Sequence, residues 1–234
     1  MSNTKNIVVW FLWVFVAMVL VLPVAYIGFI EVSARRGFPE AQSELGRWHD
    51  QGIWLHTSNQ EEAATWYSKA AENDYAEAQY NLGLLLSEQR DYQRAVYWYL
   101  RAAIKDFSPA QNNLAVMYAK GLGVSKNLRM ANHWYEKAAQ NGHEKAQYSL
   151  GIAYAEGEGI AIDHSKAAYW IYQSANRNFA PAQGYLAILY VQGLGVEKNL
   201  NEALNWANKA NANGDKHAAE LIRLIEQLKT KKEL

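Results

Sequence analysis

Residues 110–139 read AQNNLAVMYAKGLGVSKNLRMANHWYEKAA, and this stretch contains the patterns from which most of the chain is built. The first pattern begins at Ala110 and carries Ala, Gln and Leu at its first, second and fifth positions. The second begins at Trp134 and reads Trp-Tyr-Glu-Lys-Ala-Ala. Between them, Gly121 and Gly123 form a Gly-x-Gly pair. The stretch therefore predicts two helices joined by a glycine-containing connection.

Both patterns recur in phase along the chain. The first begins at Ala41, Ala78, Ala110, Ala146 and Ala182, at intervals of 37, 32, 36 and 36 residues. The second begins at Trp66, Trp98, Trp134, Trp170 and Trp206, at intervals of 32, 36, 36 and 36 residues. One helical hairpin per period cannot bury its apolar face alone and must stack on its neighbours, which predicts an α-solenoid.

The small residues of the two patterns have a packing reason. Ala or Gly closes the first pattern and paired Ala follows the tryptophan, so the helices can approach closely while Leu and Trp fill the spaces between them. A large side chain at Ala138 should overpack the core, and Trp134→Ala should open a cavity if the ring is buried.

The Gly-x-Gly pair recurs at Gly157 and Gly159 and at Gly193 and Gly195. A dinucleotide-binding loop would need a preceding strand and a third glycine, whereas here the pair follows a helix. We therefore expect the first glycine to end its helix in a left-handed conformation. The second repeat lacks the pair, which accounts for its shorter period.

These patterns in fixed order resemble the Sel1-like repeat, a relative of the tetratricopeptide repeat. The resemblance implies an all-α, right-handed solenoid of five hairpins with a C-terminal capping helix. The first copy is the least regular, because His49 replaces a Tyr and residues 51–59 depart from the pattern. The expected organisation is a tail at 1–6, a transmembrane helix at 7–30, a linker at 31–37, repeats at about 38–73, 74–105, 106–141, 142–177 and 178–213, and the cap and tail at 214–234.

The resemblance also implies that the chain binds a peptide or protein in a groove lined by the first helix of each repeat. By analogy with the tetratricopeptide groove, the implied lining is Arg47, Asp50, Tyr80, Leu84, Asn112, Val116, Lys120, Tyr148, Ile152, Glu156 and Ile188. This mixture of aromatic, aliphatic and polar side chains suits an extended peptide or a helix of a partner. The alternative is that several of the aliphatic side chains pack between repeats.

The segment from Ile7 to Ile30 contains no charged residue and exceeds the roughly 20 residues that a membrane-spanning helix needs. We interpret it as a transmembrane signal anchor. The competing interpretation is a cleaved signal peptide, because Val32-Ser33-Ala34 offers small residues at a possible cleavage site.

Positive charges flank this segment on both sides, at Lys5 and at Arg35 and Arg36. A short positive tail before an apolar anchor favours a cytoplasmic N-terminus. This predicts an inner-membrane protein of a bacterium with its repeats in the periplasm. The final Lys231-Lys232-Glu233-Leu234 departs from the usual endoplasmic-reticulum retention signal and is interpreted as a charged helix end.

Composition argues against several other functions. The 23 basic and 23 acidic residues give zero net charge, which disfavours a nucleic-acid partner. With no cysteine, neither disulfides nor thiolate metal sites hold the fold together. None of the six histidines has zincin spacing, and no nucleophile elbow or Walker loop is present. We therefore expect no metal, cofactor or enzymatic activity. The alternative is an enzyme with a groove-based active site, for example a cell-envelope hydrolase.

Overall fold

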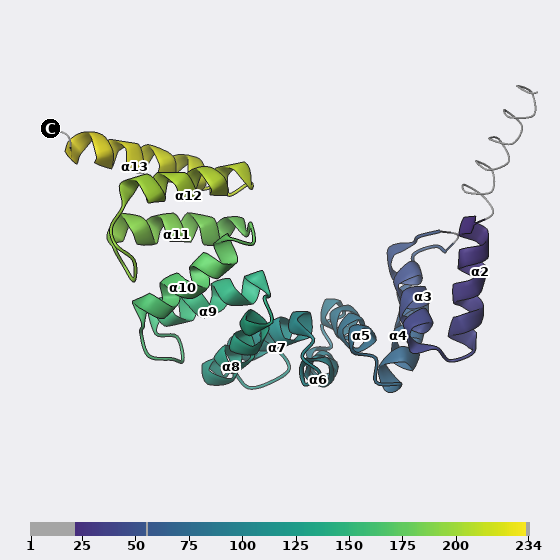
Figure 1. Cartoon of the computed structure of the whole chain (residues 1–234). Coiled ribbons are helices and arrows are strands. Elements are labelled where there is room, and N and C mark those ends of the chain that lie inside the picture. Colours follow the sequence, from purple (N-terminus) through teal and green to yellow (C-terminus); the bar gives the residue numbers. More distant parts are fainter. Residues whose placement is uncertain (1–21, 55, 233–234) are drawn as a thin grey trace, which may run out of the picture. The chain divides into compact units, whose positions relative to one another are not determined.

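The computed structural model describes residues 22–54 and 56–232, which form helices joined by short connections (Figure 1). The chain divides into two compact units between Gln89 and Arg90. The helices of the first unit are α2 (Leu22–Arg35), α3 (Pro39–Gln51), α4 (Gln60–Glu72) and α5 (Ala76–Glu88). Those of the second unit are α6 (Tyr92–Ala103), α7 (Ser108–Lys120), α8 (Leu128–Gln140), α9 (Glu144–Glu156), α10 (His164–Ala175), α11 (Ala180–Gln192), α12 (Leu200–Ala212) and α13 (Ala218–Lys232).

The helices follow the predicted repeat pattern, and the fold is an all-α solenoid. We call the first helix of each repeat its A helix (α3, α5, α7, α9 and α11) and the second its B helix (α4, α6, α8, α10 and α12). Within the units, A packs on B in the hairpins α3–α4, α7–α8, α9–α10 and α11–α12. Each B helix also packs on the helix that follows it, as α12 does on α13 (Figure 1). The right-handed sense of the solenoid stays a prediction.

A buried glutamine of each A helix binds the end of the helix before it. The side-chain Nε2 atoms donate to alanine carbonyl oxygens at 3.0–3.1 Å, and the pairs are Gln42 with Ala34, Gln79 with Ala71, Gln111 with Ala103, Gln147 with Ala139 and Gln183 with Ala175. Each of these carbonyl oxygens also accepts a backbone N–H from the turn that follows, so the glutamine adds a second hydrogen bond at the end of the helix. The glutamine of the first pattern therefore joins successive repeats.

Helix α2 takes the place of a B helix that has no A helix of its own among the described residues. Its residues Phe29 to Ala34 align with the tryptophan pattern, and Ala34 accepts the hydrogen bond from Gln42 just as the last alanine of that pattern does. Ile27, Ile30 and Ala34 are buried in a cluster with α3. Residues 31–35, predicted as part of a linker, are instead helical, and only a short turn separates α2 from α3.

The predicted membrane anchor lies mostly outside the described residues. Residues 7–21 are among those not described, and Leu22 to Ile30 form the first part of α2. Among the residues that the structure covers, no helix has the length and apolar character needed to cross a membrane. The anchor therefore stays a prediction, and its last third also packs on the first repeat.

Three of the five repeats use the tryptophan pattern differently from the prediction. Trp134 and Trp206 are buried as expected, but Trp66, Trp98 and Trp170 are only half-buried. The next residue fills the core in those repeats, because Tyr67, Tyr99 and Ile171 are at most 2% exposed. A Cβ atom on Gly46 would lie 2.7 Å from the Tyr67 ring, which confirms that the small residue ending the first pattern makes room for the partner helix.

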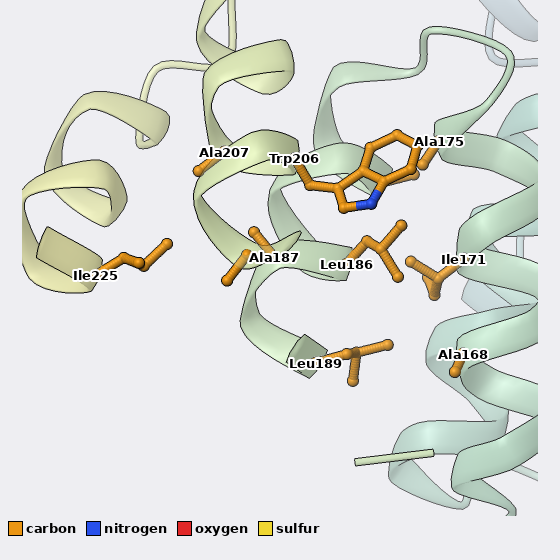
Figure 2. Close-up of a cluster of buried hydrophobic side chains, with 11 residues drawn as sticks. Ala168, Ile171, Ala175, Leu186, Ala187, Leu189, Trp206, Ala207 and Ile225 are labelled. Atoms are coloured by element: carbon orange, nitrogen blue, oxygen red, sulfur yellow. The ribbon is translucent and has the colours of Figure 1, made fainter. Parts of the chain in front are cut away.

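At the C-terminal end the core is closed by α13. Leu186 and Leu189 of α11 pack with Ile171 of α10 and Trp206 of α12, and Ile225 of α13 joins the same cluster (Figure 2). Ile225 is fully buried, whereas Leu224 and Leu228 are 51% and 44% exposed. The predicted capping helix thus covers the core with only part of its apolar stripe.

Candidate functional site

The predicted groove residues divide between the two units. Arg47, Asp50, Tyr80 and Leu84 lie in the first, and Asn112, Val116, Lys120, Tyr148, Ile152, Glu156 and Ile188 lie in the second. All of them belong to A helices, and we call the surface that they share in each unit its A-helix face. Lys120, Glu156 and Ile188 are exposed, and most of the others are half-buried. Asn112 is only 7% exposed, so its side chain belongs mainly to the interior.

Two pockets lie beside the third position of the first pattern. The residue there is Ser43, Tyr80, Asn112, Tyr148 or Gly184 in successive repeats. The described pockets at this position occur beside Ser43 and Gly184, where the side chain is small or absent. In the other three repeats a larger side chain occupies the same position. Both of these pockets therefore lie beside a small third-position residue.

The first of these pockets, which we call the N-terminal pocket, has a volume of about 600 Å³. Its lining comes from α2, α3 and the start of α5 and consists of Tyr26, Phe29, Ile30, Ser33, Arg36, Phe38, Glu40, Ala41, Ser43, Glu44, Tyr75 and Glu77. Aromatic rings thus form much of the wall, and carboxylates stand at its edge. None of the four predicted groove residues of this unit lines it.

Two of the N-terminal pocket's carboxylates are already engaged. Glu44 pairs with Arg47 and accepts a hydrogen bond from the indole Nε1 of Trp48 at 2.8 Å. Glu77 accepts one from the Tyr75 hydroxyl at 3.2 Å. Burial and the neighbouring carboxylates Glu77, Glu40 and Glu44 raise the pKa of Tyr75, so this phenol stays protonated as a donor.

The second, the Gly184 pocket, has a volume of about 550 Å³ and lies in the second unit. It is lined by Tyr148, Ala180, Pro181, Gly184, Tyr185, Ile188, Gly214, Asp215, Lys216, His217, Ala218 and Leu221. Two predicted residues, Tyr148 and Ile188, are among them. Burial raises the pKa of Tyr148 and of Tyr185, and the Glu156 carboxylate raises both further.

A smaller groove continues from the Gly184 pocket along α13. This α11–α13 groove has a volume of about 370 Å³ and is lined by Ile188, Val191, Gln192, Leu221, Leu224, Ile225, Gln227 and Leu228. It shares Ile188 and Leu221 with the Gly184 pocket, so the two form one continuous surface. An apolar surface of this kind suits the side chains of a peptide or helix.

Sequence reasoning missed several lining residues. It selected large side chains at the third position, whereas the pockets occur where that position is small. It also missed Phe38 and Tyr75, which directly precede α3 and α5 and line the N-terminal pocket. Asp215 of the Gly184 pocket, three residues before α13 begins, was missed as well. Aligning the five copies and looking for the smallest residue at each position would have found Ser43 and Gly184. Within residues 22–54 and 56–232, no three His, Asp or Glu side chains are grouped to hold a metal ion.

Comparison with known proteins gives a consistent result. The Sel1 repeat family model matches residues 39–75, 76–107, 108–143, 144–179 and 180–215. These ranges begin one or two residues after the repeats expected from the sequence. No curated protein matches the chain.

Solved structures show the same architecture. A Sel1 repeat protein from Oxalobacter formigenes is 31% identical with a TM-score of 0.73, over 80% of this chain and 75% of that one. The protective antigen c5321 of uropathogenic Escherichia coli is 30% identical with a TM-score of 0.78, over 85% of this chain and 43% of that one. YrrB, a TPR protein with a peptide-binding site, is 16% identical with a TM-score of 0.50, over 84% of this chain and 96% of that one, and shows likeness of fold.

Proposed function

Because this chain belongs to the Sel1 repeat family, we propose that it is a membrane-anchored scaffold that binds a segment of another protein on its A-helix faces. Sel1 and tetratricopeptide-like repeat proteins are generally protein-interaction scaffolds. The main support for this proposal is the pair of pockets with aromatic walls, which lie beside the small residues Ser43 and Gly184. Pockets of several hundred Å³ with apolar walls and a few polar groups are the sites that proteins use for recognition.

Site-specific photocrosslinking in living cells tests this proposal. A photoreactive amino acid replaces Ile188, which lines both the Gly184 pocket and the α11–α13 groove. The control carries the same amino acid at Tyr169, a residue 55% exposed on the B helix α10. We expect discrete adducts from position 188 and few from position 169. Equal adduct patterns from both positions would contradict binding on the A-helix face.

The anchoring part of the proposal rests on the uncharged segment from Ile7 to Ile30. In a bacterial host we expect the full chain to stay in the membrane fraction after washing at alkaline pH. A chain from which residues 7–21 are deleted should be released, while keeping α2 as the start of its first unit. Retention of the deleted chain in the membrane would contradict the anchor.

The periplasmic orientation can be tested separately. Since the chain has no cysteine, Glu136→Cys introduces a single thiol, at an exposed position of α8. We expect a membrane-impermeant maleimide to label this thiol in intact cells with a permeabilised outer membrane. Labelling only after lysis would place the repeats in the cytoplasm.

A further inference from the structure

The Gly184 pocket has aromatic walls in a fixed arrangement. The ring of Tyr148 lies edge-on to Phe179, with 5.5 Å between the ring centroids, and edge-on to Tyr185 at 6.3 Å. These contacts hold the two tyrosine rings that line the pocket. Aromatic faces attract cations, and their flat surfaces pack well against an aliphatic stem.

A carboxylate stands directly at the opening that Gly184 leaves. A Cβ atom on Gly184 would lie 2.9 Å from Oδ2 of Asp215. The other oxygen of this carboxylate, Oδ1, accepts a hydrogen bond from the His217 backbone N–H at 2.8 Å. This bond orients the side chain, and among the described residues Oδ2 has no hydrogen-bond donor or ion-pair partner.

Two further charges bear on the same space. Glu156, at the C-terminal end of α9, contributes to the raised pKa of both tyrosines, which places its carboxylate within electrostatic reach of them. Lys216 also lines the pocket, but it is exposed, and neither it nor His217 forms an ion pair within the described part of the chain. Asp215 therefore keeps an unpaired oxygen for a cation from outside.

The adjoining α11–α13 groove adds an apolar surface of its own. Leu224 and Leu228 are about half exposed there, and they continue from Ile188 and Leu221 at the edge of the Gly184 pocket. A segment that crosses both sites would meet an aromatic pocket with a carboxylate first and an aliphatic surface next. Such a surface is complementary to a segment that combines one basic side chain with several aliphatic ones.

We infer that the Gly184 pocket binds a lysine or arginine side chain of a partner protein, whose neighbouring aliphatic side chains occupy the α11–α13 groove. The side chain's methylenes pack against the exposed surfaces of Tyr148 and Tyr185, and its cation pairs with Asp215 Oδ2. This inference rests on the proposed function and specifies the chemistry of the partner. It commits to a protein segment, because the aliphatic groove has no counterpart in a small cation.

Selection from a displayed library of random dodecapeptides tests the inference. The bait is the full chain in detergent micelles, and the counter-selection uses Gly184→Tyr, which restores the residue that repeats 2 and 4 carry. This variant should fold, because the nearest atom to the new Cβ is the end of the Asp215 side chain and the next lie at 3.7 Å or beyond. We expect peptides that bind the wild type but not the variant to carry Lys or Arg beside Leu, Ile or Phe.

One selected peptide is then measured against further variants of the full chain. Asp215→Asn should weaken its binding about tenfold, since a hydrogen-bonded ion pair loses its charge. Glu156→Gln should weaken it by a smaller factor. Glu220→Gln, the matched control, removes a carboxylate from an exposed position of α13 that lines neither site and should leave binding unchanged. Circular dichroism melts of every variant check that the fold is retained.

The outcomes separate this inference from the proposed function. Peptides that bind equally to Gly184→Tyr, or whose binding depends on Glu40 of the N-terminal pocket instead, would overturn the inference and leave the scaffold function standing. Pocket-dependent peptides without a basic residue, or an unchanged affinity for Asp215→Asn, would also overturn it. If no peptide binds the wild type more than it binds empty micelles, the result counts against both.

Discussion

The connections inside the repeats differ between the second unit and the first two repeats. In repeats 3, 4 and 5 the second glycine of the Gly-x-Gly pair lies against the B helix of the preceding repeat. A Cβ atom on Gly123 would lie 2.4 Å from the Tyr92 carbonyl group, one on Gly159 would lie 2.5 Å from Leu128 Cβ, and one on Gly195 would lie 1.9 Å from the His164 carbonyl oxygen. The loop is therefore a contact between successive repeats as well as a connection within one.

Repeat 1 makes the equivalent contact with side chains. Trp54 occupies the position of the second glycine and keeps its left-handed conformation, with φ of 58°. Its ring packs on Tyr26 of α2, with ring centroids 6.4 Å apart, and His56 Nε2 lies 3.5 Å from the Glu31 carboxylate. The long connection of this repeat thus packs on α2, which stands where a preceding B helix would be.

Repeat 2 has neither a Gly-x-Gly loop nor a long connection like that of repeat 1. Its helices α5 and α6 are joined by Gln89, Arg90 and Asp91 alone, and the boundary between the two compact units falls between Gln89 and Arg90. In a solenoid each repeat gains stability from its neighbours. The Gly-x-Gly loop therefore adds a contact between successive repeats that repeat 2 lacks among the described residues.

The largest effect is expected for Gly195→Ala, which disrupts the contact between the loop of repeat 5 and the preceding repeat. The added Cβ would meet the His164 carbonyl oxygen at 1.9 Å, and the residue has φ of 70°, which side chains disfavour. Strain and overpacking together should lower the free energy of unfolding by about 3–4 kcal/mol in a urea melt. Gly214→Ala is the control, because φ there is 85° but no atom lies within 4 Å. Equal losses for both variants would contradict the repeat-joining role of the loop.

A smaller loss is expected for the first glycine of the pair. Gly193 ends α11 with φ of 74°, and an added Cβ would lie 3.2 Å from Lys198 Cβ within the same loop. Gly193→Ala should therefore cost about 1–2 kcal/mol, mainly from backbone strain. Urea melts of both variants side by side compare the two glycines. A loss larger than that of Gly195→Ala would mean that helix termination matters more than the contact between repeats.

Asn132 tests the same contact through one hydrogen bond. Its Nδ2 donates to the carbonyl oxygen of Glu158, in the loop of the next repeat, at 2.6 Å. Asn132→Ala introduces the residue that the next repeat carries at the equivalent Ala168 and should cost about 1 kcal/mol. Urea melts measure this loss. The control Asn205→Ala, at an exposed position of α12, should change the free energy of unfolding by less than about 0.5 kcal/mol.

The smallest expected effect concerns His143, which differs from the phenylalanine at the equivalent position in repeats 3 and 5. His143 precedes α9, and its Nδ1 accepts a hydrogen bond from the Ala146 backbone N–H at 3.3 Å. Burial lowers its pKa below the ordinary value of 6.5, so the folded state favours the neutral ring. This contribution is present above about pH 6.5, the ordinary pKa of histidine, and is lost as the pH falls below it.

His143→Phe introduces the residue found at the equivalent places in repeats 3 and 5, Phe107 and Phe179. The variant should lose this part of the pH dependence, as measured by urea melts between pH 7.5 and 5. The same decline in wild type and variant would assign the pH dependence to other groups.

Much of the fold could be predicted because its signals are local and repeated. Five copies of two helical patterns indicate stacked hairpins, and the position of the first glycine predicts each helix end, confirmed by the left-handed Gly121, Gly157 and Gly193. The function of the second glycine could not be predicted, because the atoms against it belong to a helix in the preceding repeat. The same limit hid the packing of Ile27 and Ile30 of α2 on α3.

The candidate site shows the same division. The sequence indicated the helices that would line it and included Tyr148 and Ile188, since position within a repeat determines which face a residue occupies. The sequence did not indicate the pockets themselves. Each lies beside a residue with a small side chain or none, and the residues of its walls are far apart in the chain.

The repeat family and the order of helices can be read from the sequence, because helical period and helix-ending glycines act within a few residues. The tertiary structure alone decided which repeats are joined by their loops, that α2 completes the first unit, and that Ser43 and Gly184 open pockets. Those properties depend on distances between atoms that are far apart in the chain. Packing sets these distances, and periodicity does not encode them.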